Sequence, residues 1–279
     1  GEEWPPDRVA FVMSLYVSGT ALGGFCGRIS AGILADWFNW RISFLALGAA
    51  ALIGSGAVAL WLPHGRPRAA AAHRTDAPLT FPYQVQALFR NRRLVATFAV
   101  GFNVLFSLVG VFTWITFYLA AAPFHLSITG LSSLFFVYLV GLVVTPAAGY
   151  LITRIGLRAG VGGAIGCSIA GVLLTLAHAL PVVIVGLAML SSGVFVAQTA
   201  SQSHLRIAAP AGAKVTAAGL YLTCYYLGGT AAGVAPGIFW AIGKWPACVA
   251  FIVLMQLAGL VVAWIGWRPS GQSHYDVEV

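Results

Sequence analysis

Eight apolar runs divide the chain, and each is close to the roughly 20 residues that a helix needs to cross the hydrocarbon core of a bilayer. They lie near residues 9–35, 42–62, 94–121, 131–152, 159–179, 181–203, 215–241 and 247–267. Apolar residues are continuous within each run, whereas the strands of a membrane barrel alternate apolar and polar positions. The pattern therefore predicts an all-α integral membrane protein, a helical bundle with about eight transmembrane helices.

The composition agrees with this pattern. Hydrophobic residues make up 59% of the chain and charged residues 8%, whereas about a quarter of the residues in a soluble domain are charged. The net charge of +8 is a feature of many nucleic-acid-binding proteins, but here the basic residues lie in short segments between the apolar runs. We therefore expect the chain to contact a lipid bilayer and no nucleic acid.

The distribution of Lys and Arg predicts the orientation. When the connections are assigned alternately, one side has only Arg41 and Lys244. The other side collects Arg8, Arg66, Arg68, Arg74, Arg90, Arg92, Arg93, Arg154, Arg158, Arg206, Lys214 and Arg268. Because cytoplasmic connections are enriched in Lys and Arg, the second side is predicted to be cytoplasmic, and both termini lie there.

A repeat relates the first two runs to the last two at a constant offset of 205 residues. Leu15, Tyr16, Leu22, Gly23, Gly24, Gly32, Ile33 and Trp40 match Leu220, Tyr221, Leu227, Gly228, Gly229, Gly237, Ile238 and Trp245. Internal repeats of this kind are typical of secondary transporters built from two similar bundles, with the substrate path between them.

The repeat predicts four parts of the chain. Residues 1–62 correspond to the last two helices of a first six-helix bundle, 63–93 to a basic cytoplasmic linker that ends in a short amphipathic helix, 94–267 to a complete second bundle, and 268–279 to a cytoplasmic tail. The equivalents of the first four helices of the second bundle would fall before Gly1. We therefore expect these 279 residues alone to be an incomplete carrier that does not transport.

Glycines recur every fourth residue in both copies of the repeat, at Gly19, Gly23 and Gly27 and at Gly229, Gly233 and Gly237. Such stripes lie on one face of a helix and let a neighbouring backbone approach closely. Close packing is one interpretation. A sharper hypothesis is that the two stripes meet each other across the interface between the bundles.

Residues that could carry enzyme chemistry are absent from the interior of the predicted spans. The acidic residues, at positions 2, 3, 7, 36, 76, 276 and 278, and the six histidines lie in termini, in loops or near helix ends. The four cysteines are scattered singly. An intramembrane transferase would need convergent acid or base groups, so we expect no enzyme, no metal site and no cofactor.

Arg28 is the exception, because it lies inside an apolar span, where an arginine costs roughly 3 kcal/mol on insertion scales. Two interpretations remain open. Its side chain extends to the outer membrane surface, with Asp36 nearby, or it faces the central path and attracts an anionic substrate group or replaces a proton site.

Polar and aromatic residues at helical spacing suggest the wall of a cavity for a moderately hydrophobic small molecule. Each one could instead be an ordinary packing or hydrogen-bonding residue between helices. The candidates are Tyr16, Asn103, Trp114, Tyr138, Gln198, Tyr221 and Tyr225, together with Arg28.

Three stretches resemble motifs of the major facilitator superfamily, specifically bacterial drug and sugar efflux permeases of the proton-antiporter type. "EEWPPDRVAFVMSLY" is similar to the pattern that precedes the fifth helix of that group. "GTALGGFCGR" resembles its antiporter motif G-x-x-x-G-P-x-x-G-G, with Gly24 in place of the proline and Arg28 in place of the last glycine. "GYLITRIGLR" resembles the cytoplasmic-loop motif G-x-L-x-D-R-x-G-x-R and retains Gly149, Leu151, Arg154, Gly156 and Arg158, with Thr153 in place of the aspartate.

The resemblance implies that the chain corresponds to helices five to twelve of twelve, and that Arg154 and Arg158 form a latch between helices that changes with conformation. The alternative is that these arginines only set the topology. It also implies alternating-access export of a small organic compound against protons, by a protein of the bacterial inner membrane that is monomeric when full length. Uptake by the same fold and a non-transporting membrane remnant are the alternatives.

The orientation generates a prediction. Reporter proteins fused after residues 75 and 210 should be active on the cytoplasmic side, and those fused after residues 125 and 244 on the periplasmic side, because Lys and Arg concentrate next to the first two positions. The measurement is alkaline phosphatase activity, which requires export, against fluorescence of a cytoplasmic reporter. The opposite pattern would contradict the orientation and the assignment of the loop motif.

Overall fold

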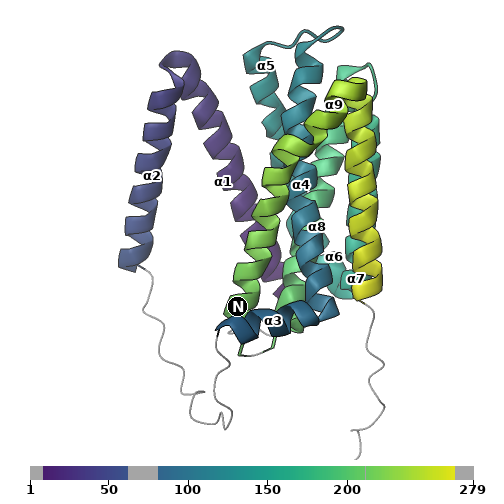
Figure 1. The fold of residues 1–279 in the computed structure, drawn as a ribbon. Coiled ribbons are helices and arrows are strands. Elements are labelled where there is room, and N and C mark those ends of the chain that lie inside the picture. The colour runs from purple at the N-terminus through teal and green to yellow at the C-terminus, as the bar shows by residue number, and fades with distance from the viewer. Residues whose placement is uncertain (1–8, 62–80, 211, 268–279) are drawn as a thin grey trace, which may run out of the picture.

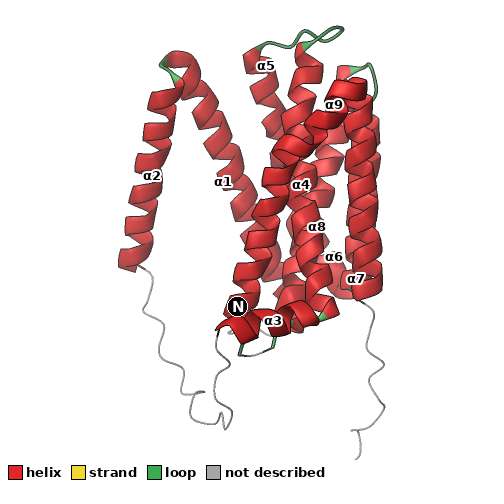
Figure 2. Ribbon diagram, viewed as in Figure 1, coloured by secondary structure: helices red, strands yellow, loops and turns green. Residues whose placement is uncertain are grey.

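The computed structural model describes residues 9–61, 81–210 and 212–267, and every regular element in these ranges is helical (Figures 1 and 2). Six of the described helices are long and apolar enough to cross a membrane. In chain order the elements are α1 (Val9–Trp37), α2 (Trp40–Trp61), α3 (Phe81–Arg90), α4 (Arg92–Ala120), α5 (Ile128–Ser133), the 3-10 helix η3 (Leu134–Phe136), α6 (Val137–Ile155), α7 (Leu157–Leu174), α8 (Leu180–Ala208) and α9 (Lys214–Gly266). The predicted all-α membrane fold is confirmed.

The 53-residue helix α9 supplies two of the predicted spans. Its backbone leaves the helical region at Gly243 and Lys244, where Lys244 has φ of 53°. The arms on either side, 214–242 and 245–266, run side by side in opposite directions (Figure 1). The rings of Phe239 and Phe251 stack across them, with centroids 4.2 Å apart. The predicted boundary between the last two apolar runs therefore corresponds to this break.

Helix α4 forms the centre of the bundle. In its most apolar segment 72% of the residues are buried, against 6% for α2. It packs along both arms of α9, and small residues allow the close approach. A Cβ atom at Gly228 of α9 would collide with the backbone carbonyl of Phe102 on α4. Helices α7 and α8 pack through a similar contact, in which Gly171 and Gly186 meet backbone to backbone.

Helices α1 and α2 form a hairpin beside this bundle, with α1 leaning on α6 and α8 and α2 packed against α1 (Figure 1). The turn between them is held by two hydrogen bonds. The backbone N–H of Ile42 donates to Asn39 Oδ1 at 3.0 Å, and Ser43 Oγ donates to the carbonyl of Ala31 at 3.0 Å.

The two glycine stripes do not meet, so the hypothesis that they pack against each other is wrong. A Cβ atom at Gly19, Gly23 or Gly27 would have no described atom within 4 Å. On α9, the stripe faces α4 within its own bundle, where Gly229 lies against Leu105 and Gly237 against Trp114. The stripes are separated because α1 reaches the bundle through α6 and α8 rather than through α9.

The predicted amphipathic helix at the end of the linker is α3, which lies across the start of α4 and α9 (Figure 1). Leu88 is buried against the bundle, and Thr216 Oγ1 donates a hydrogen bond to Gln84 Oε1 at 2.7 Å. The remainder of the predicted linker, the predicted tail and the first eight residues lie outside the described residues.

The contact between α4 and α9 generates a prediction. Gly228→Ala should lower the free energy of unfolding by about 1 to 3 kcal/mol, the usual cost of overpacking, because the new methyl group collides with a backbone carbonyl that cannot move aside. Gly233→Ala on the same arm is the matched control, since nothing lies within 4 Å of its Cβ position. Thermal unfolding in detergent measures both, and equal stability of the two variants would contradict the close approach.

Candidate functional site

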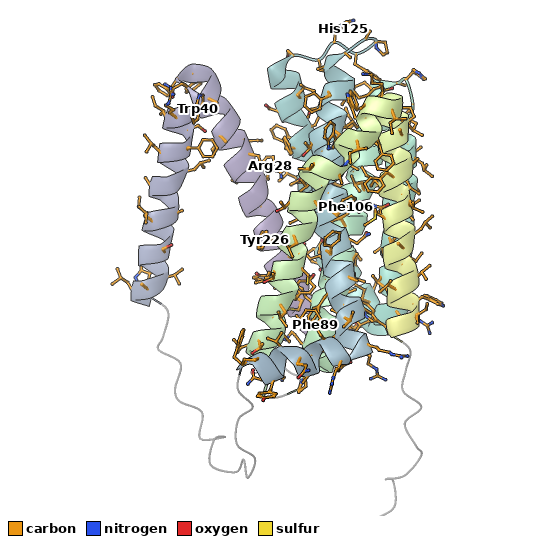
Figure 3. The ribbon with its side chains drawn as sticks, in the orientation of Figure 1. Arg28, Trp40, Phe89, Phe106, His125 and Tyr226 are labelled. Carbon is orange, nitrogen blue, oxygen red and sulfur yellow. The ribbon has the colours of Figure 1, made fainter. Side chains whose placement is uncertain are left out.

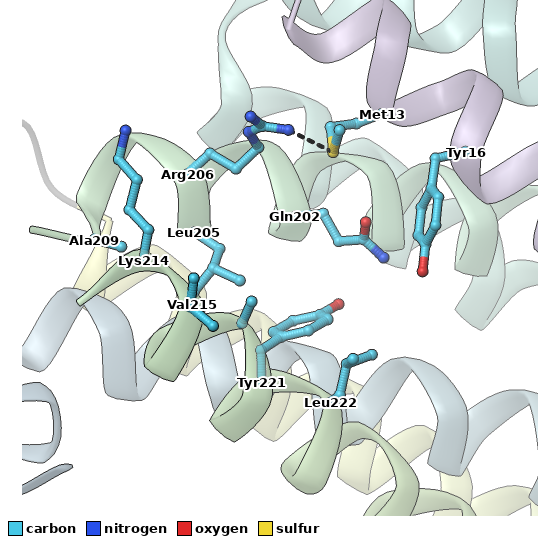
Figure 4. Close-up of a pocket in the computed structure, with 11 residues that line it drawn as sticks. Met13, Tyr16, Gln202, Leu205, Arg206, Ala209, Lys214, Val215, Tyr221 and Leu222 are labelled. Atoms are coloured by element: carbon cyan, nitrogen blue, oxygen red, sulfur yellow. Dashed lines mark hydrogen bonds between the residues drawn. The ribbon is translucent and has the colours of Figure 1, made fainter. Parts of the chain in front are cut away.

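A pocket of about 470 Å³ lies between α1, α8 and the first arm of α9 (Figure 4). It is found where α8 ends and α9 begins, at the same end of the bundle as α3. Its lining residues are Met13, Tyr16, Gln202, Leu205, Arg206, Ala209, Lys214, Val215, Ala218, Tyr221 and Leu222.

Two of the predicted cavity residues, Tyr16 and Tyr221, line this pocket from opposite sides. They are also partners in the 205-residue repeat. Tyr221 is buried because its ring lies on Gly101 of α4, where a Cβ atom would be 2.5 Å from the ring. Its hydroxyl accepts a hydrogen bond from Ser201 Oγ at 3.2 Å. Tyr16 is half exposed toward the pocket side of α1.

Three further candidates extend this polar surface along α6, α8 and α9. The ring of Tyr225 stacks on Tyr221 with centroids 6.2 Å apart. Gln198 is buried on α8. The ring of Tyr138 is buried, with its edge or face turned to Phe112 of α4 and Phe195 of α8, at centroid distances of 5.0 and 5.6 Å.

The Arg28 side chain extends from α1 to α6 (Figure 3). That it faces the central path and attracts an anionic group or replaces a proton site stays a prediction. Arg28 Nη1 donates a hydrogen bond to the Tyr138 hydroxyl at 2.8 Å. The guanidinium carbon lies 4.9 Å from the centre of the Phe135 ring and 5.7 Å from that of Tyr138. A hydroxyl acceptor and two aromatic faces thus replace part of the hydration of the cation, although the side chain keeps one exposed side.

Asn103 and Trp114 do not belong to this surface, which corrects the prediction that they line the cavity. The Asn103 amide donates to the Met255 carbonyl, and its Oδ1 accepts from Ser107 Oγ at 3.3 Å. Trp114 Nε1 donates to the Ala232 carbonyl at 3.2 Å. Both side chains lie between α4 and α9, where their polar groups are satisfied inside the bundle.

The loop-motif residues lie at the junction of α6 and α7. Gly156 has φ of 88°, a conformation that favours glycine, and it ends α6 and begins α7. Arg158 Nη2 donates to the Trp264 carbonyl at 2.7 Å, with its guanidinium 4.1 Å from the centre of that ring, so it joins α7 to α9. Arg154 instead stacks on Tyr150 of its own helix. Gly149 is buried on α6.

The comparison with known families gives one decisive match. The model of the Major Facilitator Superfamily matches residues 1–233. The chain belongs to the major facilitator superfamily. The family and the membrane-bundle fold expected from the sequence motifs are therefore confirmed.

Individual members of the superfamily are also similar to this chain. Inner membrane transport protein YnfM of Escherichia coli (strain K12) is 36% identical over 265 residues, which cover 94% of this chain and 62% of that protein. An uncharacterized transporter of Buchnera aphidicola (subsp. Schizaphis graminum) is 32% identical over 267 residues, covering 94% and 62%. Uncharacterized MFS-type transporter YybF of Bacillus subtilis (strain 168) is 32% identical over 263 residues, covering 93% and 63%. The chain thus spans a little under two thirds of the length of these relatives.

Sequence reasoning did not single out most of the residues that line the pocket, nor Phe135 beside Arg28. Arg206 and Lys214 were counted only as topology charges, although both line the pocket. Met13 and Phe135 gave no signal, because a Met or Phe in an apolar run has the same appearance whether it faces lipid, core or cavity. Gln198, Gln202 and Arg206 follow one another at intervals of four residues, and this spacing places Arg206 on the same face of α8 as the two glutamines.

The contact between α1 and the rest of the chain generates a prediction. A Cβ atom at Gly32 would lie 4.0 Å from Ser132 Cβ, within the range of about 3.5 to 4.5 Å seen in disulfides. With the native cysteines replaced by alanine, Gly32→Cys and Ser132→Cys should therefore cross-link under mild oxidation, detected by mass spectrometry after proteolysis. The control pair Gly23→Cys and Ser132→Cys should not. Equal cross-linking of both pairs would contradict the observed arrangement of α1.

Proposed function

We propose that this chain belongs to a secondary transporter that exports a small organic compound in exchange for protons, by alternating access of two bundles. In this proposal α1 and α2 belong to the first bundle and α4 to α9 form the second. The path runs between α1 and the face of α6, α8 and α9. The carrier lies in the bacterial inner membrane with both termini in the cytoplasm, works as a monomer and has no enzyme activity.

One observation supports the proposal most strongly, namely that the two ends of α1 meet the second bundle differently. Beyond its middle, α1 is held to α6 by Arg28 and Tyr138, and Phe25 packs on Phe136 with ring centroids 5.3 Å apart. Near its start, α1 packs Ser14 and Val17 into the bundle, while Met13 and Tyr16 line the pocket. In this proposal the Arg28 contact closes the path at one end and the pocket opens it at the other, as alternating access requires of each state.

The coarse class of function is supported by family membership and by the relatives, one of which is named an inner membrane transport protein. Export and proton exchange rest on a narrower basis, the resemblance of the sequence around Gly19, Gly23 and Gly27 to the antiporter motif. Uptake with protons by the same fold is the second candidate, because alternating access by itself sets no direction.

The direction of an imposed pH gradient separates the two candidates. The protein, produced from its own gene, is reconstituted in proteoliposomes and tested with an anionic, a cationic and a neutral probe: 1-naphthoate, ethidium and arabinose. Exchange for protons predicts that at least one probe accumulates when the lumen is acidic. Accumulation only with an alkaline lumen would identify a symporter, and no gradient-dependent flux of any probe would contradict the proposed function.

Arg28 gives the corresponding variant. Every transport cycle must break and remake its contact with Tyr138, so Arg28→Gln should lower the initial rate of flux by about tenfold, the effect of a coupling of about 1.4 kcal/mol. Arg41→Gln is the control, since Arg41 lies at the start of α2 and its guanidinium stacks on Trp40. Flux at the normal rate in the Arg28 variant, at equal protein abundance, would show that the contact does not take part in the cycle.

A further inference from the structure

We propose that the pocket between α1, α8 and α9 takes a small organic anion with an aromatic body, whose charged group is bound by Arg206 and Lys214. This inference rests on the proposed function and specifies the class of substrate. It is carried by the arrangement of charge and of aromatic surface in the pocket, which neither the family nor the named relatives specify.

The described residues that line the pocket include two cations and no acidic residue. Arg206 comes from the end of α8 and Lys214 from the start of α9, and both side chains line the same cavity. Arg206 Nη1 donates a hydrogen bond to the sulfur of Met13 at 3.8 Å, and a thioether is a weak acceptor. Among the side chains that the structure describes, none belongs to an aspartate or a glutamate. The pocket therefore offers several strong donors to an anion.

The surroundings strengthen this preference. Leu205, Val215 and Leu222 line the pocket beside the two cations, together with the rings of Tyr16 and Tyr221. Charges that face a wall of this kind are screened less than charges in open water, so an anionic group gains more from them and a cationic group is repelled more strongly.

The remainder of the pocket fits an aromatic body. Figure 4 shows Arg206 and Lys214 at one end, with the rings of Tyr16 and Tyr221 and the amide of Gln202 toward the other. The two rings offer stacking faces, and the amide offers a donor and an acceptor. A flat amphipathic molecule with an anionic group at one end matches this division. The volume of about 470 Å³ is in the range of small-molecule sites.

A phospholipid headgroup presents the same anionic oxygen atoms as a free organic anion. Because the pocket lies at an end of the bundle, a headgroup is the second possible source of this anion. The two sources differ in what accompanies the charge. An aromatic carboxylate would stack on the rings of Tyr16 and Tyr221, whereas a lipid phosphate would leave these rings without a stacking partner. We commit to the free anion, and the experiment separates it from the lipid.

The test uses two probes of the same shape and opposite charge, 1-naphthoate and 1-naphthylmethylammonium, and measures binding by calorimetry to the whole protein in phosphatidylcholine nanodiscs at low salt. The anion should bind at least about tenfold more tightly than the cation. Arg206→Gln and Lys214→Gln should each weaken anion binding by about threefold to tenfold. Arg90→Gln, at the end of α3 and outside the pocket, should leave it unchanged.

Three results would overturn the inference: equal binding of the two probes, anion binding that does not change in the Arg206 and Lys214 variants, or loss of anion binding when phosphatidylglycerol replaces phosphatidylcholine, which would identify a lipid site. Failure of the transport assay with selective anion binding intact would refute the proposed function and leave the charge preference standing. Gradient-driven flux of both probes at equal rates would refute only the charge preference.

Discussion

Close packing between α4 and α9 is the contact on which the remainder of the bundle formed by α4 to α9 depends. In a bilayer the hydrophobic effect does not draw helices together, so small residues that admit a neighbouring backbone must supply the association. Gly228 on the Phe102 carbonyl and Gly237 on Trp114 bring the first arm of α9 onto α4. This approach fixes Tyr221 over Gly101, and so it places one wall of the pocket. The site is built on the most buried helix of the chain.

Helical periodicity predicted the spans and most of the candidate surface, because the period of 3.6 residues determines which side chains share a face. The rings of Tyr221 and Tyr225 stack on each other, and Tyr138 packs against Phe195 of α8, whereas a common cavity wall for these residues stays a prediction. Periodicity does not determine which neighbour a face meets. Asn103 and Trp114 lie on a regular stripe of α4, yet that stripe faces α9, where carbonyls of Met255 and Ala232 accept their hydrogen bonds. Only the arrangement of helices separates a buried stripe from a cavity wall.

The charge of Arg28 shows the same limit of sequence reasoning. The charge of an arginine in an apolar span must be solvated by water or by polar groups of another helix, and the sequence left open which of the two does so. The structure supplies Tyr138 and the Phe135 ring, and Phe135 gives no polar signal in the sequence. The contact joins α1 to α6, whereas the antiporter motif that contains Arg28 would carry a glycine there. A residue that departs from the resembled motif is thus one of those that link α1 to the rest of the chain.

The repeat relates residues at the pocket and at the Arg28 contact to equivalent positions in its other copy. Tyr16 and Tyr221 occupy equivalent positions, and both line the pocket. A space lined by both members of a repeat pair lies between the two repeats, and in the proposed function that space is the substrate path. Arg28 is equivalent to Gly233, whose Cβ position has open space around it. The two copies therefore match beside the pocket and differ at the position of the charge. In the proposed arrangement of two bundles, the symmetry of the repeat is therefore broken at the contact between Arg28 and Tyr138, and it is preserved at the pocket.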